Sequence, residues 1–279
     1  MFVALRPGSR VLTALALRVK KIPRSLERRA LFRSEKRRLD LQRETSPHSS
    51  DFSFGPDYPL FADRDSEAGD ASGHYFHQDL VVAREIFRNN PRRHIDVGSS
   101  IYGFVSHVAS FRDIEVLDIR PVVSPVAGIS FIKQNVMELD DTWNAAADSV
   151  SCLHALEHFG LGRYGDPIDY DGWRRGFEGI VRLVEPGGTV YLSVPTGTPQ
   201  RIEFNAHRVF ALPFLREFFG VHLDILSLSF VLDDGSLRHD VDPFSTDAER
   251  SFDSKYGCSI WTLRKSSVPR LDVARPSSR

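Results

Sequence analysis

A glycine-containing loop and the acidic residue that follows it have the spacing of a nucleoside-binding site. Residues 93–98 are predicted to form a short buried strand that runs through Asp96-x-Gly98, and Gly103 follows after a tight turn into a helix. Backbone N–H groups at such a turn are available to a ligand. The next predicted strand ends in Asp118, 22 residues after Asp96. Its carboxylate can accept hydrogen bonds from two ribose hydroxyls, so loop and acid together predict nucleoside recognition.

The residues inside this loop discriminate between nucleoside ligands. A dinucleotide fingerprint needs a middle glycine where the backbone approaches the pyrophosphate, and Ser100 stands there. A phosphate-binding P-loop needs Gly-Lys-Ser/Thr after the turn, which Ile101-Tyr102-Gly103 does not supply. S-adenosylmethionine has no pyrophosphate and tolerates a looser glycine spacing. It is therefore favoured over NAD, and a tight turn that binds nothing is the alternative.

Several residues with acid–base or anion-binding side chains follow the predicted fourth and fifth strands. A hydroxyl acceptor in a group-transfer reaction needs a base with a pKa near the working pH, which favours histidine. Acidic residues could orient such a histidine or bind a polar substrate, with Asp166 on a mobile lid, and arginines could bind a carboxylate or phosphate. The predicted catalytic residues are His158, His207, Glu157 and Asp166, and the predicted substrate-binding residues are Arg163, Asn205 and Arg208. The alternative for Glu157 and His158 is a structural role at a helix N-terminus.

One segment also has the spacing of a zinc-peptidase motif. His154-Ala155-Leu156-Glu157-His158 is H-x-x-E-H, in which both histidines bind zinc and the glutamate is the base. On a continuous helix the two imidazoles would share one face. However, the motif directly follows a predicted strand, Gly160 and Gly162 interrupt any helix, and no third ligand is identified. No metal is therefore predicted, and a zinc hydrolase is the less favoured alternative.

The elements that must position these residues alternate between strands and helices. Phe76, Leu80, Ala83 and Phe87 recur at helical spacing before Pro91. Further helices are predicted over residues 104–111 and 173–184. The predicted strands are residues 93–98, 114–119, 129–136, 149–153, 189–194, 223–232 and 259–263. This alternation predicts a mainly parallel sheet, whose ligands bind at the carboxyl ends of the strands.

Composition indicates a globular domain preceded by a basic arm. The chain has 279 residues, 41% hydrophobic, and a net charge of −1, which excludes a disordered chain, while two cysteines exclude a disulfide framework. Residues 1–43 contain 13 Lys/Arg and three acidic residues, so the remainder carries −11. We predict a basic helical arm (1–43), a polar linker (44–72), one domain (73–267) and a mobile tail (268–279). The arm could contact an anionic membrane, or it is simply solvated; nucleic acid is disfavoured for the acidic domain.

Several blocks between residues 75 and 265 resemble class I S-adenosylmethionine-dependent methyltransferases. They are residues 96–103, Asp118, Asn135-Val136, the strand running into Leu156-Glu157-His158, and Glu185-Pro186-Gly187-Gly188. A closer resemblance, to the uncharacterised domain-of-unknown-function family 268, is carried by three longer blocks. These are residues 74–80 (HYFHQDL), 151–167 (SCLHALEHFGLGRYGDP) and 204–210 (FNAHRVF). The middle block is long and polar, which makes this resemblance specific.

The resemblance implies a Rossmann-like α/β fold with about seven mostly parallel strands, and S-adenosylmethionine as cofactor. It implies that Gly98, Ser99 and Gly103 line the methionine and ribose end, next to Asp96. Asp118 would hold the ribose hydroxyls, and Asn135 and Val136 would meet the adenine edge. Leu153 and His154 would lie beneath the sulfonium. Ser100 and Tyr102 depart from the usual glycine positions of the loop.

Together these patterns predict methyl transfer from S-adenosylmethionine to an oxygen or nitrogen atom of a small polar or carbohydrate acceptor. The alternative is a non-catalytic binding module with a methyltransferase fold. A cytoplasmic location is expected, with peripheral membrane attachment through residues 1–43. The sequence does not indicate the oligomeric state.

Overall fold

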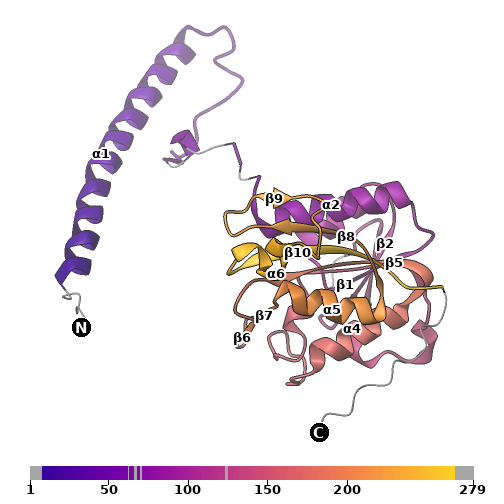
Figure 1. Cartoon of the computed structure of the whole chain (residues 1–279). Coiled ribbons are helices and arrows are strands. Elements are labelled where there is room, and N and C mark those ends of the chain that lie inside the picture. Colours follow the sequence, from indigo (N-terminus) through magenta and orange to yellow (C-terminus); the bar gives the residue numbers. More distant parts are fainter. Residues whose placement is uncertain (1–7, 62, 66–67, 70, 123–124, 268–279) are drawn as a thin grey trace. The chain divides into compact units, whose positions relative to one another are not determined.

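The computed structural model describes residues 8–61, 63–65, 68–69, 71–122 and 125–267, and it describes side chains from Leu26 onward. The chain divides into two compact units, Met1–Asp70 and Ala71–Arg279 (Figure 1). The predicted tail, residues 268–279, lies outside the described residues, as do the first seven residues of the predicted arm.

The first unit is built around one long helix, α1 (Gly8–Thr45), followed by the short 3-10 helix η1 (Asp63–Asp65). Ion pairs connect the described part of α1 to the segment after it. Glu35 pairs with Arg64, and Lys36 Nζ lies 3.7 Å from Asp57 Oδ1. No helix among the described residues is long and apolar enough to cross a membrane.

The second unit contains an eight-stranded sheet with the order β3-β2-β1-β4-β5-β10-β8-β9. The strands are β1 (His94–Val97), β2 (Ile114–Asp118), β3 (Ile129–Lys133), β4 (Ala147–Leu153), β5 (Val184–Thr196), β8 (Asp224–Val231), β9 (Leu237–Arg238) and β10 (Gly257–Arg264). β1 to β5 pair in parallel, whereas β10 runs antiparallel between β5 and β8. The prediction of about seven mostly parallel strands is confirmed. A separate hairpin, β6 (Arg201–Glu203) with β7 (His207–Val209), was not predicted, because three-residue strands carry no periodic signal.

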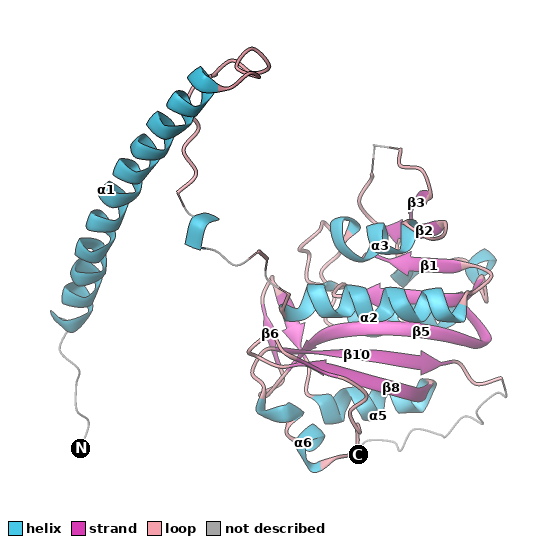
Figure 2. Ribbon diagram, turned by 90° about the horizontal axis from the view of Figure 1, so that it is seen from above, coloured by secondary structure: helices cyan, strands magenta, loops and turns pink. Residues whose placement is uncertain are grey.

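Helices cover both faces of this sheet (Figures 1 and 2). They are α2 (Gly73–Asn89), the π-helical turn η2 (Ile101–Val105) with α3 (Ser106–Ala109), α4 (Gly172–Leu183), α5 (Leu212–His222) and α6 (Thr246–Glu249). Short 3-10 turns are η3 (Val136–Glu138), η4 (Asp141–Trp143), η5 (Leu156–His158) and η6 (Ser251–Asp253). α2 and α3 pack in one hydrophobic cluster, and α4 and α5 pack in the other. In α4, Trp173, Phe177 and Ile180 are buried at the spacing of one helix face.

The helix predicted from Phe76 to Phe87 exists, but of the four residues that indicated it only Ala83 is buried. Phe76 is 41% exposed and Phe87 is 65% exposed. The buried face instead includes Gln78 and Asp79 beside apolar residues of α2. Gln78 Oε1 accepts a hydrogen bond from Ser193 Oγ of β5 at 2.6 Å. Polar partners inside the core thus set the rotation of α2, and a hydrophobicity pattern does not show them.

A line of polar side chains connects β1 to β4 inside the core. His94 Nδ1 lies 2.8 Å from Ser149 Oγ, and His94 Nε2 lies 3.1 Å from Ser151 Oγ. Ser151 Oγ in turn donates to Asp96 Oδ1 at 2.6 Å. Burial lowers the pKa of His94 to about 3, so this imidazole is neutral in the folded protein at neutral pH.

We predict that His94→Gln changes how the stability of the protein depends on pH. Below pH 6.5 His94 binds a proton in the unfolded chain, whereas in the folded protein it stays neutral down to about pH 3. The contribution of His94 is therefore fully present above pH 6.5 and is lost as the pH falls, by about 1.4 kcal/mol per pH unit. Urea unfolding at several pH values between about 4.5 and 7 measures this dependence. The slope should be present in the wild type and missing in His94→Gln. The exposed His239→Gln variant should follow the wild type, and parallel profiles for all three proteins would contradict the prediction.

Candidate functional site

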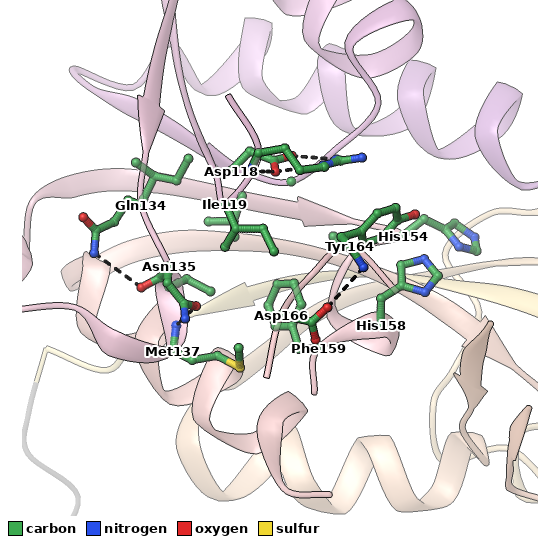
Figure 3. A pocket seen from close by; sticks show the side chains of 16 residues that line it. Asp118, Ile119, Gln134, Asn135, Met137, His154, His158, Phe159, Tyr164 and Asp166 are labelled. Atoms are coloured by element: carbon green, nitrogen blue, oxygen red, sulfur yellow. Dashed lines mark hydrogen bonds and ion pairs between the residues drawn. The ribbon is translucent and has the colours of Figure 1, made fainter. Parts of the chain in front are cut away.

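Two adjoining cavities lie at the carboxyl ends of β1, β2 and β4. This is the position where the strand order reverses on either side of β1, and ligands of open α/β sheets bind there. The cavities measure about 550 Å³ and about 1040 Å³. Both are lined by Gly98, Asp118, Arg120, His154 and Tyr164. Figure 3 shows side chains from several different strand ends around the first cavity.

The loop after β1 is fixed from within by Asp96. Its carboxylate is fully buried and accepts hydrogen bonds from Ser99 N at 2.9 Å, Ser99 Oγ at 2.5 Å and Ser151 Oγ at 2.6 Å. Burial raises the pKa of Asp96 to about 6, against the lowering effect of these donors. Ser99 Oγ also accepts from Leu153 N at 3.0 Å. Asp96 is not among the residues lining either cavity, so it positions the loop and does not contact a ligand there, contrary to the prediction.

The two predicted glycines of this loop have different roles. Gly98 lines both cavities and has a φ of +69°, a left-handed conformation that glycine adopts without strain. Gly103 lines neither cavity. A Cβ at Gly103 would collide with the Asp79 carboxylate of α2. Glycine at 103 thus leaves room for the Asp79 side chain of α2, and the predicted cofactor contact of Gly103 stays a prediction.

Asp118 at the end of β2 lines both cavities, as predicted for a ribose ligand. Its carboxylate is paired with Arg120, which the sequence analysis did not single out. Asp118 Oδ1 accepts from Arg120 N at 2.8 Å and Nε at 3.0 Å, and Oδ2 accepts from Nη2 at 2.7 Å. The Arg120 guanidinium also lies over the Tyr164 ring, 4.3 Å from its centroid. The Asp-x-Arg spacing was the available signal for this local pair.

The residues after β3 form another wall of the first cavity, which Gln134, Asn135, Val136 and Met137 line (Figure 3). Asn135 Oδ1 accepts from Met137 N at 3.1 Å and so caps η3. The cap orders the segment that carries Val136. Of the predicted cofactor residues, Gly98, Asp118, Asn135, Val136 and His154 line the first cavity, and Gly98, Ser99, Asp118, Leu153 and His154 line the second.

A buried ion pair follows β4. His154 Nδ1 lies 2.7 Å from Glu157 Oε1, and both side chains are almost fully buried. Burial is the largest single effect on the pKa of His154 and lowers it, but Glu157 and Cys258 together outweigh burial and raise that pKa to about 10. His154 has a φ of +51°, which is unusual for a residue with a Cβ and requires support from its surroundings. The second carboxylate oxygen, Glu157 Oε2, has no hydrogen-bond partner among the described residues.

The other two predicted histidines lie next to each other. His158 Nδ1 lies 2.6 Å from Ala206 O, which makes it the donor, and His158 Nε2 lies 3.7 Å from Glu157 Oε1. Burial lowers the pKa of His158 despite the neighbouring Glu157. His207 Nε2 lies 2.9 Å from Glu203 Oε2, and the His158 and His207 ring centroids are 6.5 Å apart. His158 lines the first cavity, whereas His207 is not among the lining residues of either.

The predicted substrate-binding residues differ in how far they are buried. Arg208 is 4% exposed and donates to the carbonyl oxygens of Glu157, Phe159 and Tyr170. Because these bonds hold the chain in place, Arg208 is a structural brace and its predicted substrate role is corrected. Arg163 and Asn205 are exposed, and Arg163 Nη1 donates to Ala206 O at 2.9 Å.

The helix required by the zinc-peptidase interpretation does not form. The segment makes only the 3-10 turn η5, and the two histidines contact different partners, Glu157 and Ala206. The H-x-x-E-H alternative is wrong in this respect, because a 3-10 turn does not place residues 154 and 158 on one α-helical face.

Asp166 also differs from its predicted role on a mobile lid. Its carboxylate accepts from Gly160 N at 2.7 Å, Gly162 N at 3.2 Å and Tyr164 N at 3.2 Å. It is 9% exposed. Asp166 therefore orders the loop that carries Tyr164, and it also lines the first cavity, so its predicted catalytic role stays a prediction.

We predict that Asp166→Ala loosens this loop without unfolding the protein. Removal of the carboxylate leaves backbone N–H groups unpaired, and each hydrogen bond to a charged group contributes about 1.5–3 kcal/mol. Amide hydrogen exchange over residues 160–165 should accelerate at least about tenfold, since 1.4 kcal/mol corresponds to a factor of ten. Asp113→Ala, at an exposed position outside both cavities, is the control. Unchanged protection of residues 160–165 from hydrogen exchange would show that the hydrogen bonds of Asp166 do not order this loop.

The strand order, with β10 antiparallel between β5 and β8, and the cavities at the switch point define a Rossmann-like class I methyltransferase fold. Residues 112–220 match the family model described as "Caenorhabditis protein of unknown function, DUF268". This match confirms the resemblance predicted from the sequence. No curated protein matches the chain.

Several solved structures are similar to this chain at low sequence identity. The [4+2]-cyclase SpnF is 14% identical, with 72% of this chain and 86% of that chain covered and a TM-score of 0.48. The N-methyltransferase NodS from Bradyrhizobium japonicum, in complex with S-adenosyl-L-homocysteine, is 10% identical, with 69% and 88% covered and a TM-score of 0.45. The Burkholderia thailandensis 1,6-didemethyltoxoflavin-N1-methyltransferase is 18% identical, with 67% and 78% covered and a TM-score of 0.46.

Proposed function

We propose that this protein binds S-adenosylmethionine in the cavities at the carboxyl ends of β1, β2 and β4, and transfers its methyl group to an oxygen or nitrogen atom of a small polar or carbohydrate acceptor. The observation that carries the proposal is the position of Asp118, whose carboxylate lines both cavities at the end of β2.

The residues present fit such a cofactor. Asp118 can accept from both ribose hydroxyls once the Arg120 side chain, which is 49% exposed, turns out into solvent. Asn135 and Val136 stand at the adenine side, and Gly98, Ser99, Leu153 and His154 stand at the methionine side. The bound cofactor would supply the electrophilic methyl group, and the protein would align the acceptor and exclude water.

The protonation states favour His158 as the base. His154 is already protonated at neutral pH, because Glu157 and Cys258 together raise its pKa to about 10, and it cannot take a second proton. His158 is neutral there, because its pKa is lowered by burial, and its Nδ1–H is used by Ala206 O. Its Nε2 lone pair can therefore accept the acceptor's proton, and Glu157 at 3.7 Å would stabilise the resulting imidazolium. His207, Arg163 and Asn205 are proposed to contact the acceptor at the outer side of His158.

We predict that Asp118→Ala weakens binding of S-adenosylmethionine at least about 100-fold, because two charge-assisted hydrogen bonds to the ribose are lost. Isothermal titration with S-adenosylmethionine and with S-adenosylhomocysteine measures this, and far-UV circular dichroism checks that the fold is intact. Asp113→Ala is the matched control, because Asp113 is an exposed aspartate that directly precedes β2. Equal affinity in Asp118→Ala and wild type would refute the assignment. Cofactor binding without turnover on any acceptor would favour the non-catalytic binding module.

We predict the opposite effect for Arg120→Ala. Its guanidinium occupies the Asp118 oxygens that the ribose needs. An exposed ion pair contributes about 0.2–1 kcal/mol, so releasing it should tighten binding by up to about fivefold. The same titration measures this change, with exposed Arg88→Ala as the control. If binding instead weakened more than about tenfold, which corresponds to about 1.4 kcal/mol of binding free energy, Arg120 itself would be shown to hold the cofactor.

A further inference from the structure

A second cluster of reactive side chains lies beside the proposed cofactor site, and the mechanism above does not use it as a unit. His74 of α2, His154 after β4 and Cys258 of β10 each direct one donor atom to a common point. These three atoms all lie within 4.8 Å of one another. His154 and Cys258 are buried, and His74 is partly buried. Three elements far apart in the sequence thus bring two imidazoles and a thiol together.

The hydrogen bonds behind the two imidazoles fix which nitrogen faces the common point. His74 Nε2 lies 3.1 Å from the carbonyl oxygen of Tyr256, and His154 Nδ1 lies 2.7 Å from Glu157 Oε1. Both partners are acceptors, so these two nitrogens carry the protons. Histidines that bind metals are held in this way, with one ring N–H donated to a carbonyl or carboxylate.

The inward nitrogens face each other across a short gap. His74 Nδ1 and His154 Nε2 are 3.1 Å apart, so the second proton of the His154 imidazolium lies between them in the metal-free protein, and a divalent cation can take the place of that proton. The Cys258 thiol lies 4.0 Å from Gln78 Oε1 and 3.8 Å from Ser259 O, and it also interacts with the His154 side chain. A divalent ion bound to a Cys258 thiolate, with the Glu157 carboxylate behind His154, would give a cluster without net charge. Such neutrality removes most of the cost of burying charges in the core.

We propose that His74, His154 and Cys258 bind one zinc ion. Imidazole and thiolate are the ligands that zinc prefers, and three protein ligands leave the fourth tetrahedral position open. Zn–N and Zn–S bond lengths place tetrahedral donor atoms about 3.3–3.6 Å apart, close to the 3.1 Å between the two nitrogens. Small side-chain movements of Cys258 complete the geometry.

The surroundings connect this ion to the cavities. His154 lines both cavities and Tyr75, whose ring centroid is 5.0 Å from that of His154, lines the second. Tyr256 lies against His74, with ring centroids 5.2 Å apart. The ion would therefore stand at the edge of the ligand space, and its open position could take a water or an oxygen, nitrogen or sulfur atom of an acceptor. The site shares His154 and Glu157 with H-x-x-E-H but not His158, so the two zinc hypotheses are separable.

The test is zinc binding by the full chain after dialysis against a chelator. Competition with a chromogenic zinc chelator gives stoichiometry and affinity, and substitution with Co²⁺ gives a thiolate-to-cobalt absorption band. We expect one zinc per chain, with affinity reduced more than about 100-fold in His74→Gln and Cys258→Ala, and about 10–100-fold in Glu157→Gln. The cobalt–thiolate band should disappear in Cys258→Ala. Circular dichroism of each variant checks the fold.

The chain offers matched controls for both ligands. His77 is also on α2, with its Nε2 3.1 Å from Gly235 O, and Cys152 is the other buried cysteine. His77→Gln and Cys152→Ala should bind zinc as the wild type does. The proposal is overturned if the wild type binds no stoichiometric zinc, or if His158→Gln abolishes binding while His74→Gln does not. Titration of the metal-free protein with S-adenosylmethionine separates failure of this site from failure of the cofactor proposal.

Discussion

The buried carboxylate of Asp96 is the interaction on which the binding edge of the sheet depends. A carboxylate is costly to bury unless donors surround it, and here Ser99 and Ser151 supply three. Two of the donors come from the loop after β1 and one from β4. The same bonds therefore fix the loop at the switch point and the spacing of the two central strands. The cavity beside Gly98 follows from this arrangement.

The pair formed by Glu157 and His154, which follows β4, is subject to the same constraint: a buried charge needs a partner. Its charges are removed from water, so each stabilises the other's ionised form, and His154 keeps its left-handed backbone conformation. One consequence is a difference in protonation between neighbouring histidines. His154 is charged, whereas burial lowers the pKa of His158, whose Nδ1–H is donated to Ala206 O.

Much of the fold could be predicted because its signals are local. Short apolar runs bounded by Gly or Pro marked the main strands, and the position of Asp118 after β2 followed from them. The roles of Asp166 and Arg208 could not be predicted in this way. Both are charged residues that hold backbone groups of segments folded against them, and the same residue types in solvent would be expected to bind substrate.

The sequence by itself determined the succession of strands and helices along the chain and the acidic residue at the end of β2, because these follow from periodicity and chain direction. Only the tertiary structure decided which polar side chains meet. The rotation of α2 turns Gln78 inward towards Ser193, and it also brings His74 to His154 and Cys258. Those contacts join α2, β4, β5 and β10, and their partners are set by packing of whole elements, which no spacing along the chain encodes.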